Sequence, residues 1–512
     1  MGKGQRARAE RAAEKEALKP IIEKKAKKTR IKKIVISVVA IVLVVALVGS
    51  LIYNAIYSAA FNSGKIQRNT TILESEHYTV DAAMMSYLFY TEYNDFLNNY
   101  SSYLSYFGLD TSKSLKRQDC MMETGSTWFE YFSGLAGDKA KELLYLAENA
   151  HKEKMTLNED DQKNIQQGID SIYEAAKSNG MANEKFLSAA FGTGVKESDV
   201  RKCMELSAMA QKYLDKYTES LIYTDADLQK YYEDNIDSFR YVDYYSYIVS
   251  ASDTADSKTY PAAKVKADAL AAVKSTDAFA KWVESDFLAG HPVTAEYTAE
   301  KQKEELSAAT SSLAKTKVLY AEEDEGSKWL FKTAKVGETY VYDDKAGNYT
   351  VYYCTATPYR DETLTRTIRD IVLTEGTYEK DKVKDKANEL FEAMKKEGLT
   401  EETFKKYCSE YSENTASNTN GGLCENYKES SFEGNIGRWT YSADRKVGDF
   451  EVVQIDGGYA LCYYVGEGIA AWKADCTNDK KNSDYNAAME VWKKEITLTE
   501  NEKGYNKIPD IA

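Results

Sequence analysis

The feature that most constrains this 512-residue chain is an internal repeat in its second half. The matching segments are Trp329–Gly337 with Trp439–Gly448, Val336-Gly337-Glu338 with Val447-Gly448-Asp449, and Asn348-Tyr349 with Gly458-Tyr459. The period is about 110 residues. Two copies of one fold are therefore expected in tandem, and each copy must supply its own core.

Each copy has the pattern of a small α+β domain. The stretches "YVDYYSYIVSA" and "TRTIRDIVLTEG" alternate or are rich in β-branched and aromatic residues, which is typical of strands. Helical segments follow, and each copy closes with two further apolar, tyrosine-containing stretches. The sequence predicts two β-α-β-β units, and the fold class of the whole chain is α+β.

The region before the repeats reads as helices. Residues 75–225 contain apolar residues at helical spacing, and the whole region is free of proline. Asn158 provides a helix start and Gly180 a helix stop. A last helical segment near the C-terminus carries Tyr485 and Trp492, and because an isolated helix of that length is marginal in water, we expect it to dock on the N-terminal helices.

The N-terminus predicts a membrane anchor. Residues 1–33 hold 13 Lys and Arg against 4 Glu, and the uncharged apolar run Ile34–Tyr53 follows. Twenty such residues match the roughly 30 Å hydrocarbon core, and basic flanks stay on the cytoplasmic side. We expect a basic cytoplasmic head at 1–33, a transmembrane anchor at 34–57, and the bulk of the chain outside the cell membrane.

Composition excludes several function classes. The total charge of −14 leaves −23 for the chain after residue 33, which disfavours nucleic-acid binding. The seven cysteines form no CxxC motif or Cys/His cluster, so no metal and no cofactor is expected. Cys408 and Cys424 are close enough in sequence to pair, but the sequence leaves that open. There is no P-loop and no GxSxG motif.

The order of the motifs resembles the SurA/PrsA-type extracytoplasmic foldases. "TDADLQKYYEDNIDSFRYVDYY" is similar to the linker of that family, and "TWFEYF" and "FLSAAFGTGVKESDV" look like its helical chaperone domain. Both repeats look like parvulin-type peptidyl-prolyl isomerase domains, from the loop containing Ser412, Gly421 and Gly422 to the "VGD…GGY" segment. The resemblance implies a helical chaperone domain at 75–240, parvulin-like domains at 241–360 and 364–468, and a docking helix at 480–502.

The resemblance also indicates where isomerase chemistry would lie. Parvulins use two facing histidines with a Cys or Asp beside them. In the second repeat those positions carry Asp370, Ala460 and Asn414. In the first repeat Tyr247 and Thr350 take the places of the two histidines. The histidine pair is missing from both repeats, so we expect weak or no isomerase activity.

The expected function is to bind unfolded or nascent exported polypeptides near the membrane. Phe432, Trp439 and Tyr459 would line the groove of the second repeat, and Met84 and Met85 would give the helical domain an adaptable apolar surface. The secretion channel is an expected partner, since chaperones of this layout stand at its exit. An active peptidyl-prolyl isomerase and a non-enzymatic scaffold of a membrane secretion complex remain as alternatives.

Overall fold

A computed structural model describes residues 63–380, 382–414, 417–432 and 434–511. The predicted head and transmembrane anchor lie outside this range, and across the described residues no helix combines the length and apolarity that a membrane crossing needs. The described chain is a mixed α+β structure with two compact units. Unit 1 contains residues up to 222, 370–422 and 481 onward, and unit 2 contains 223–369 and 423–480.

The N-terminal part of unit 1 is a helical body with a small sheet. Its helices are α2 (Lys65–Arg68), α3 (Ala82–Tyr100), α4 (Leu104–Phe107), α5 (Trp128–Lys152), α6 (Glu159–Ser178), α7 (Asn183–Phe191) and α8 (Glu197–Ser220). The strands β1 (Thr71–Glu74), β2 (Thr79–Asp81) and β11 (Thr499–Glu500) pair in the order β11-β1-β2. One apolar core, which includes Phe89, Trp128 and Phe132, connects these helices. Asn158 caps α6, where the sequence predicts a helix start, and Asp81 caps α3.

The long helix α17 (Ala471–Glu495) leads into the C-terminal residues. Its Trp492 belongs to the core of unit 1 and makes edge contacts with Tyr213 and Tyr217 of α8, at ring-centroid distances of 5.6 and 5.2 Å. The 3₁₀ helix Glu502–Lys507 follows, and Ile508 is buried in the same core. The C-terminal segment therefore docks on the N-terminal helices, the contact that the sequence led us to expect for Trp492.

The two repeats have the same strand topology. The first sheet has the order β4-β3-β6-β5 and the second β8-β7-β10-β9, which is one order when strands are numbered within each repeat. The first repeat consists of β3 (Arg240–Ser250), α10 (Tyr260–Ala271), α11 (Thr276–Gly290), α12 (Ala299–Ser311), β4 (Ala314–Leu319), α13 (Glu325–Lys332), β5 (Thr339–Asp343) and β6 (Asn348–Arg360). The second consists of β7 (Leu364–Thr374), α14 (Val383–Glu397), α15 (Glu401–Tyr411), β8 (Leu423–Tyr427), α16 (Gly434–Thr440), β9 (Phe450–Ile455) and β10 (Gly458–Ala470). The internal repeat is confirmed.

Each sheet holds four strands where the sequence predicts three. The additional strands are β4 and β8, which are short and polar, and the burial of β4 does not alternate. Both carry a bulge whose residue has a left-handed backbone, Lys317 in β4 (φ 51°) and Asn426 in β8 (φ 56°). Such edge strands lack the period-2 pattern by which strands are recognised, so the sequence alone did not reveal them.

The turn before the last two strands of each repeat contains the Val-Gly-acidic triplet, Val336-Gly337-Glu338 or Val447-Gly448-Asp449, and makes the same backbone hydrogen bonds in both repeats. Gly337 N–H donates to Cys354 O at 2.8 Å, and Gly448 N–H donates to Tyr464 O at 2.9 Å. Both glycines have positive φ, 86° and 92°, a conformation that other residues rarely adopt. This requirement explains why the Val-Gly-acidic triplet is the clearest sequence trace of the repeat.

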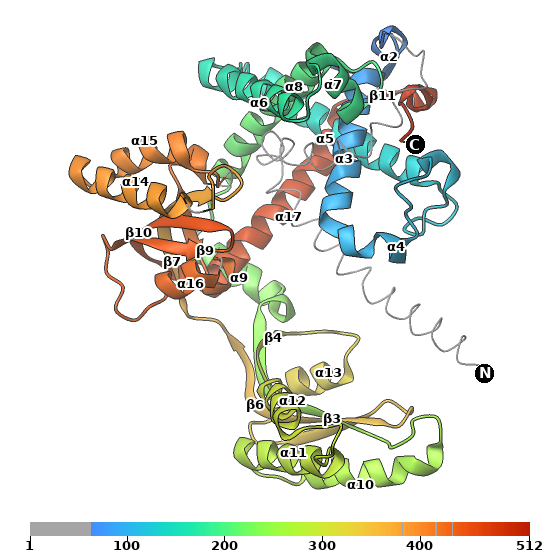
Figure 1. Cartoon of the computed structure of the whole chain (residues 1–512), viewed down its shortest axis with the longest axis vertical. Helices are drawn as coiled ribbons and strands as arrows, with labels where there is room; N and C mark the ends of the chain where they lie inside the picture. Colours follow the sequence, from blue (N-terminus) through green and yellow to red (C-terminus); the bar gives the residue numbers. More distant parts are fainter. Residues whose placement is uncertain (1–62, 381, 415–416, 433, 512) are drawn as a thin grey trace. The chain divides into compact units, whose positions relative to one another are not determined.

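In the first repeat, helices cover both faces of the sheet (Figure 1). Helix α10 packs on the face that carries Val249 and Val351, and α13 packs on the face that carries Val242 and Tyr352. The linker before this repeat contains α9 (Asp225–Asp234), whose Tyr232 joins Trp472 in a small separate core within unit 2. All seven cysteines are buried and none forms a disulfide, so Cys408 and Cys424 are not paired with each other.

Candidate functional site

Two of the three predicted isomerase positions are in direct contact. The Asp370 carboxylate accepts hydrogen bonds from Asn414 Nδ2 and from Ser417 Oγ, both at 2.7 Å. Asp370 is 4% exposed and Ser417 is 2% exposed. The sequence found Asp370 and Asn414 but missed Ser417. Both carboxylate oxygens are thus used to hold the loop after α15, and this is how a structural anchor is arranged.

The backbone around Asp370 is held as tightly as its side chain. Asp370 N–H donates to Gly422 O at 2.9 Å, and Gly422 has a φ of 75°. A Cβ on Gly422 would lie 2.2 Å from Asp370 O, so only glycine fits. On the same loop, Glu413 N–H donates to Val372 O at 2.8 Å. The Gly421-Gly422 pair that the sequence singled out therefore serves close backbone packing.

The third predicted position, Ala460, lies in β10 opposite Val453 of β9 and has no exposed surface. It offers neither a hydrogen-bonding group nor a proton carrier. The chain has three histidines, at positions 77, 151 and 291. None of them lies in a sheet of either repeat.

The three predicted groove residues of the second repeat have different environments. Trp439 is 8% exposed, its Nε1 donates to Glu451 Oε2 at 2.7 Å, and the Arg445 guanidinium lies 4.0 Å from its ring centroid. Phe432 is half-buried with its ring 5.2 Å from that of Tyr427, and Tyr459 is half-buried in β10 opposite Gln454. Trp439 is a core residue of α16, whereas Phe432 and Tyr459 keep accessible surface. Their contact with a polypeptide stays a prediction.

The first repeat corrects one expectation about the site. Ser246 N–H donates to Leu313 O at 3.0 Å, as Asp370 N–H does to Gly422 O, so Ser246 and not Tyr247 occupies the position of Asp370. Tyr247 pairs with Val351 and faces α10, whereas Thr350 pairs with Ile248 and lies on the other face. A shift of one residue along a strand reverses the face of every side chain. Tyr247 and Thr350 therefore cannot share a site.

The helical body corrects a second expectation. Met84 is 4% exposed and Met85 is fully buried, and both belong to the core of unit 1. The first turns of α3 lie against α7, α8 and the β1–β2 strands, so several sides of this helix are covered. In this structure Met84 and Met85 pack the core and present no surface to a client. Met121, which precedes α5, is 51% exposed.

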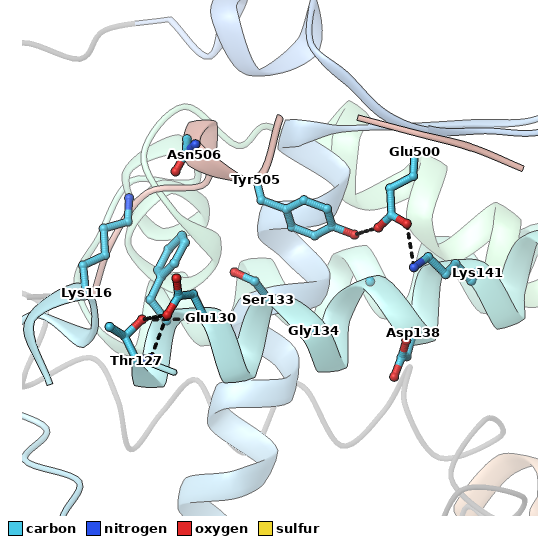
Figure 2. Close-up of a pocket in the computed structure, with 12 residues that line it drawn as sticks. Lys116, Thr127, Glu130, Ser133, Gly134, Asp138, Lys141, Glu500, Tyr505 and Asn506 are labelled. Atoms are coloured by element: carbon cyan, nitrogen blue, oxygen red, sulfur yellow. Dashed lines mark hydrogen bonds and ion pairs between the residues drawn. The ribbon is translucent and has the colours of Figure 1, made fainter. Parts of the chain in front are cut away.

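Unit 1 instead carries a groove that the sequence did not reveal (Figure 2). Its volume is about 430 Å³, and it lies between the first half of α5 and the C-terminal segment. The lining residues are Lys116, Thr127, Phe129, Glu130, Ser133, Gly134, Gly137, Asp138, Lys141, Glu500, Tyr505 and Asn506. The sequence signal that could have indicated the groove is the pair Gly134 and Gly137, about one helical turn apart, because glycines leave one face of α5 without side chains.

The floor of the groove is helix backbone. A Cβ on Gly134 would meet no atom within 4 Å, so the space above it is open. Tyr505 lies over Gly137, where a Cβ would come 2.4 Å from the tyrosine oxygen. The Tyr505 hydroxyl donates to Glu500 Oε1 at 2.9 Å, and Lys141 Nζ lies 2.8 Å from Glu500 Oε2. Burial, and then the neighbouring Glu500, raise the pKa of Tyr505, so it stays a neutral donor.

The rim and wall of the groove combine apolar and polar groups. Lys116 Nζ lies 4.1 Å from the centroid of the Phe129 ring. Glu130 closes a capping box with Thr127, whose hydrogen bonds lower the pKa of the Glu130 carboxyl. Ser133 is 7% exposed, and its Oγ has no hydrogen-bond partner among the described residues. A buried hydroxyl without a partner is costly, so Ser133 lowers the stability of this part of α5.

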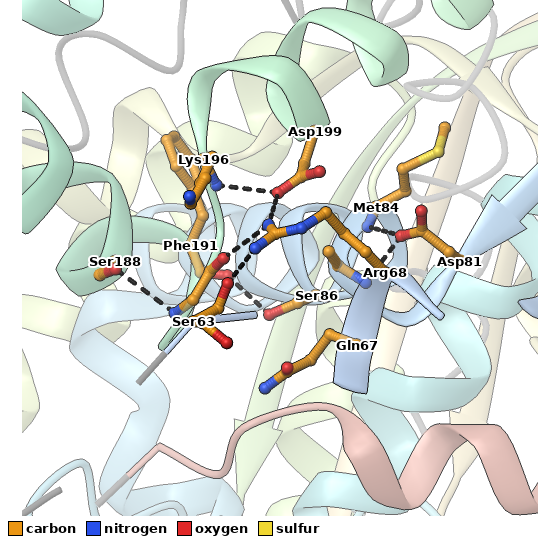
Figure 3. Close-up of polar contacts among 12 residues, drawn as sticks. Ser63, Gln67, Arg68, Asp81, Met84, Ser86, Ser188, Phe191, Lys196 and Asp199 are labelled. Carbon is orange, nitrogen blue, oxygen red and sulfur yellow. Dashed lines mark hydrogen bonds and ion pairs between the residues drawn. The ribbon is translucent and has the colours of Figure 1, made fainter. Parts of the chain in front are cut away.

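A buried ion pair fixes the start of the described chain on α8 (Figure 3). Arg68 Nη1 lies 2.6 Å from Asp199 Oδ2 and also donates to Gly194 O at 2.9 Å. The backbone N–H of Lys196 donates to the same Asp199 oxygen at 2.9 Å. A Cβ on Gly64 would lie 2.1 Å from Gly194 O, so the two loops touch through their backbones. The "FGTGVKESD" stretch thus serves a structural joint within unit 1.

Two of the histidines form a second polar cluster at the other end of α5. His77 Nδ1 lies 2.8 Å from Glu148 Oε2, and the rings of His77 and His151 stack at 3.7 Å. Burial of Glu148 acts to raise its pKa, but hydrogen bonds from Ser75 and His77 outweigh that effect and hold the pKa of this carboxyl below its ordinary value. His291 is exposed at the C-terminal end of α11.

Comparisons with known proteins give limited information about this chain. No protein-family model matches it, and no curated protein is similar to it in sequence. Two similar solved structures are the peptidylprolyl isomerase PrsA of Bacillus anthracis and the foldase protein PrsA of Lactococcus lactis. The first is 10% identical and covers 44% of this chain and 95% of its own, with a TM-score of 0.18. The second is 12% identical and covers 69% and 97%, with a TM-score of 0.17. At such scores neither likeness carries an argument.

Proposed function

We propose that this chain is a membrane-anchored chaperone of the SurA/PrsA type that holds unfolded exported polypeptides on the outer side of the cell membrane. The groove on α5 is the observation that carries the proposal. Its volume of about 430 Å³ lies in the range of ligand sites. Its glycine floor admits a chain to the helix backbone, and Phe129 and Tyr505 supply apolar contact.

The repeats support binding in preference to catalysis. Rotation about a prolyl peptide bond has a barrier of about 20 kcal/mol, and a catalyst must favour the twisted amide over the planar one. In the second repeat, Asp370 already accepts two hydrogen bonds from its own loop, and Ala460 is apolar and buried. We therefore propose that the parvulin-like domains bind extended chains with little or no isomerase activity.

The decisive experiment is aggregation of an unfolded client with the full-length protein in detergent micelles. Gly134→Trp fills the open space of the groove, and Gly290→Trp is its matched control, because both glycines are exposed in helices and a Cβ added at either would meet no atom within 4 Å. The wild type and Gly290→Trp should slow aggregation equally, and Gly134→Trp should lose most of that effect. Equal protection by all three proteins would reject the groove as the client site.

A separate measurement addresses catalysis. Exchange spectroscopy by NMR on a Xaa-Pro peptide, with the protein at several concentrations, reports the cis/trans interconversion rate directly. We expect shift changes or broadening of the peptide signals without faster interconversion. Faster interconversion that rises with protein concentration would make the protein an isomerase that works without histidines.

A further inference from the structure

The edge strands of the described sheets are not equally protected. The edges are β11 and β2 in the small sheet, β4 and β5 in the first repeat, and β8 and β9 in the second. An edge presents unpaired backbone N–H and C=O groups to which another strand can bond, and folded proteins usually block it with charges, bulges or short length. Strands β11 and β2 have two and three residues, too short to accept a further strand.

Three of the other four edges are blocked. In β4 the left-handed Lys317 turns its N–H to Asp243 Oδ1 at 2.8 Å. In β8 the left-handed Asn426 turns its N–H to Thr367 Oγ1 at 3.2 Å. In β9 the outward carbonyl of Gln454 accepts a bond from Asn435 Nδ2 of α16 at 2.8 Å. Each of these edges uses a side chain or a bulge to interrupt the row of free groups.

Strand β5, with the sequence TYVYD, has no bulge, and its one charged residue, Asp343, stands at its C-terminal end, where it pairs with Lys345. Its pairing with β6 runs from Thr339 opposite Tyr353 to Asp343 opposite Tyr349 without a register shift. One backbone hydrogen bond lies at each end of β5: Cys354 N–H donates to Glu338 O, and Asp344 N–H donates to Asn348 O. These bonds show that the backbone groups of the even-numbered residues point toward β6. Because antiparallel pairing alternates, the backbone groups of Thr339, Val341 and Asp343 point outward, and no hydrogen bond from another described residue reaches them.

An aromatic surface lies beside this edge. The ring of Tyr340 stacks on Trp329 at a centroid distance of 5.4 Å, and Tyr342 follows on the same side of the strand. Val336, just before β5, is 64% exposed. Side chains of a strand added here would lie against these rings on one face and against Val341 on the other, so apolar or aromatic residues at alternate positions would fit best.

We propose that β5 takes an extended segment of an unfolded polypeptide as an additional strand of the first sheet. This inference rests on the proposed chaperone function and identifies a second point of contact for the same client. Backbone hydrogen bonds supply affinity without regard to sequence, and the aromatic face adds a preference for apolar side chains at every second position. A chaperone that serves many clients needs this combination of general backbone recognition and weak side-chain selectivity.

Hydrogen exchange of the full-length wild type in micelles tests the proposal without any mutation. The probe is reduced, carboxymethylated α-lactalbumin, a permanently unfolded chain. On its addition, peptides that cover residues 336–344 should exchange at least several-fold more slowly, while peptides that cover β9 should not change. Unchanged exchange in 336–344 would overturn the proposal. Slower exchange that follows protein concentration without the probe would also overturn it, because the occupant would be a second copy of the chain.

Two matched proline variants provide the second test. Val341 in β5 and Val452 in β9 occupy the same register position, opposite Val351 and Leu461 respectively. Both are half-buried and turn their N–H outward, so Val341→Pro and Val452→Pro lose no ladder bond. Val341→Pro should weaken probe binding about tenfold, and Val452→Pro should not. Equal affinities would overturn the proposal, whereas failure of the wild type to bind the probe would reject the chaperone function itself.

Discussion

Truncation of Trp492 to alanine should loosen the contact between the C-terminal end of α17 and helix α8. Trp492 is 7% exposed and its ring contacts Tyr213 and Tyr217. A tryptophan buries roughly 150–250 Å², and truncation of such a buried aromatic side chain costs about 3–5 kcal/mol. The loss should appear first where the ring lies, at the end of α8.

The assay has to resolve that local loss. A chain with several cooperative parts has no single free energy of unfolding, so hydrogen exchange of the amides at 213–220 is the suitable measurement. A loss of about 3 kcal/mol corresponds to more than hundredfold faster exchange. Val491→Ala is the matched control, because Val491 precedes Trp492 on the same helix but is 49% exposed, and its truncation should change exchange less than threefold. Equal effects of the two variants would refute the docking argument.

Three further variants probe the polar groups. Asp370→Ala should speed exchange in 412–422 more than tenfold, since two charge-assisted hydrogen bonds of about 1.5–3 kcal/mol each are lost, while the exposed Glu392→Ala should leave that loop unchanged. Ser133→Ala should slightly slow amide hydrogen exchange in the first half of α5, because it removes a buried hydroxyl that has no hydrogen-bond partner among the described residues. The lowered pKa of Glu148 means that its stabilising contribution is present above its ordinary pKa and is lost as pH falls through the lowered value. In Glu148→Gln the amides of residues 75–78 should therefore exchange faster than in the wild type at pH 7 but at the wild-type rate in acid, and a constant difference would contradict this linkage.

The elements that sequence reasoning found are those with local signals. Helix starts follow from capping residues such as Asp81 and Asn158, and the repeat follows from a turn that needs glycine at a left-handed position. Asp370 and Asn414 were placed in one site by the resemblance to parvulins, and their side chains are in contact. The caps and the turn could be found because each depends on residues that are neighbours in sequence.

The features that the sequence did not reveal depend on contacts between distant segments. Met84 and Met85 have the pattern of an apolar helix face, and nothing local shows that α7, α8 and the β1–β2 strands cover it. The groove requires Tyr505 to lie over Gly137, at a separation of several hundred residues. The correspondence of Ser246 with Asp370 depends on backbone hydrogen bonds to Leu313 and Gly422, which lie many residues away and leave no mark in the pattern.

The repeated turn and bulge have a consequence for how this chain can be studied. Because the two repeats make equivalent backbone hydrogen bonds, their sequences can be aligned with each other residue by residue. Valine occurs at both 341 and 452, and glycine at both 337 and 448, whereas Ser246 stands against Asp370 and Thr350 against Ala460. The shared positions are those that hold the sheet together. The divergent ones lie at positions where the resemblance stated from the sequence predicts a site, so a comparison of the two copies separates framework residues from candidate site residues without any second protein.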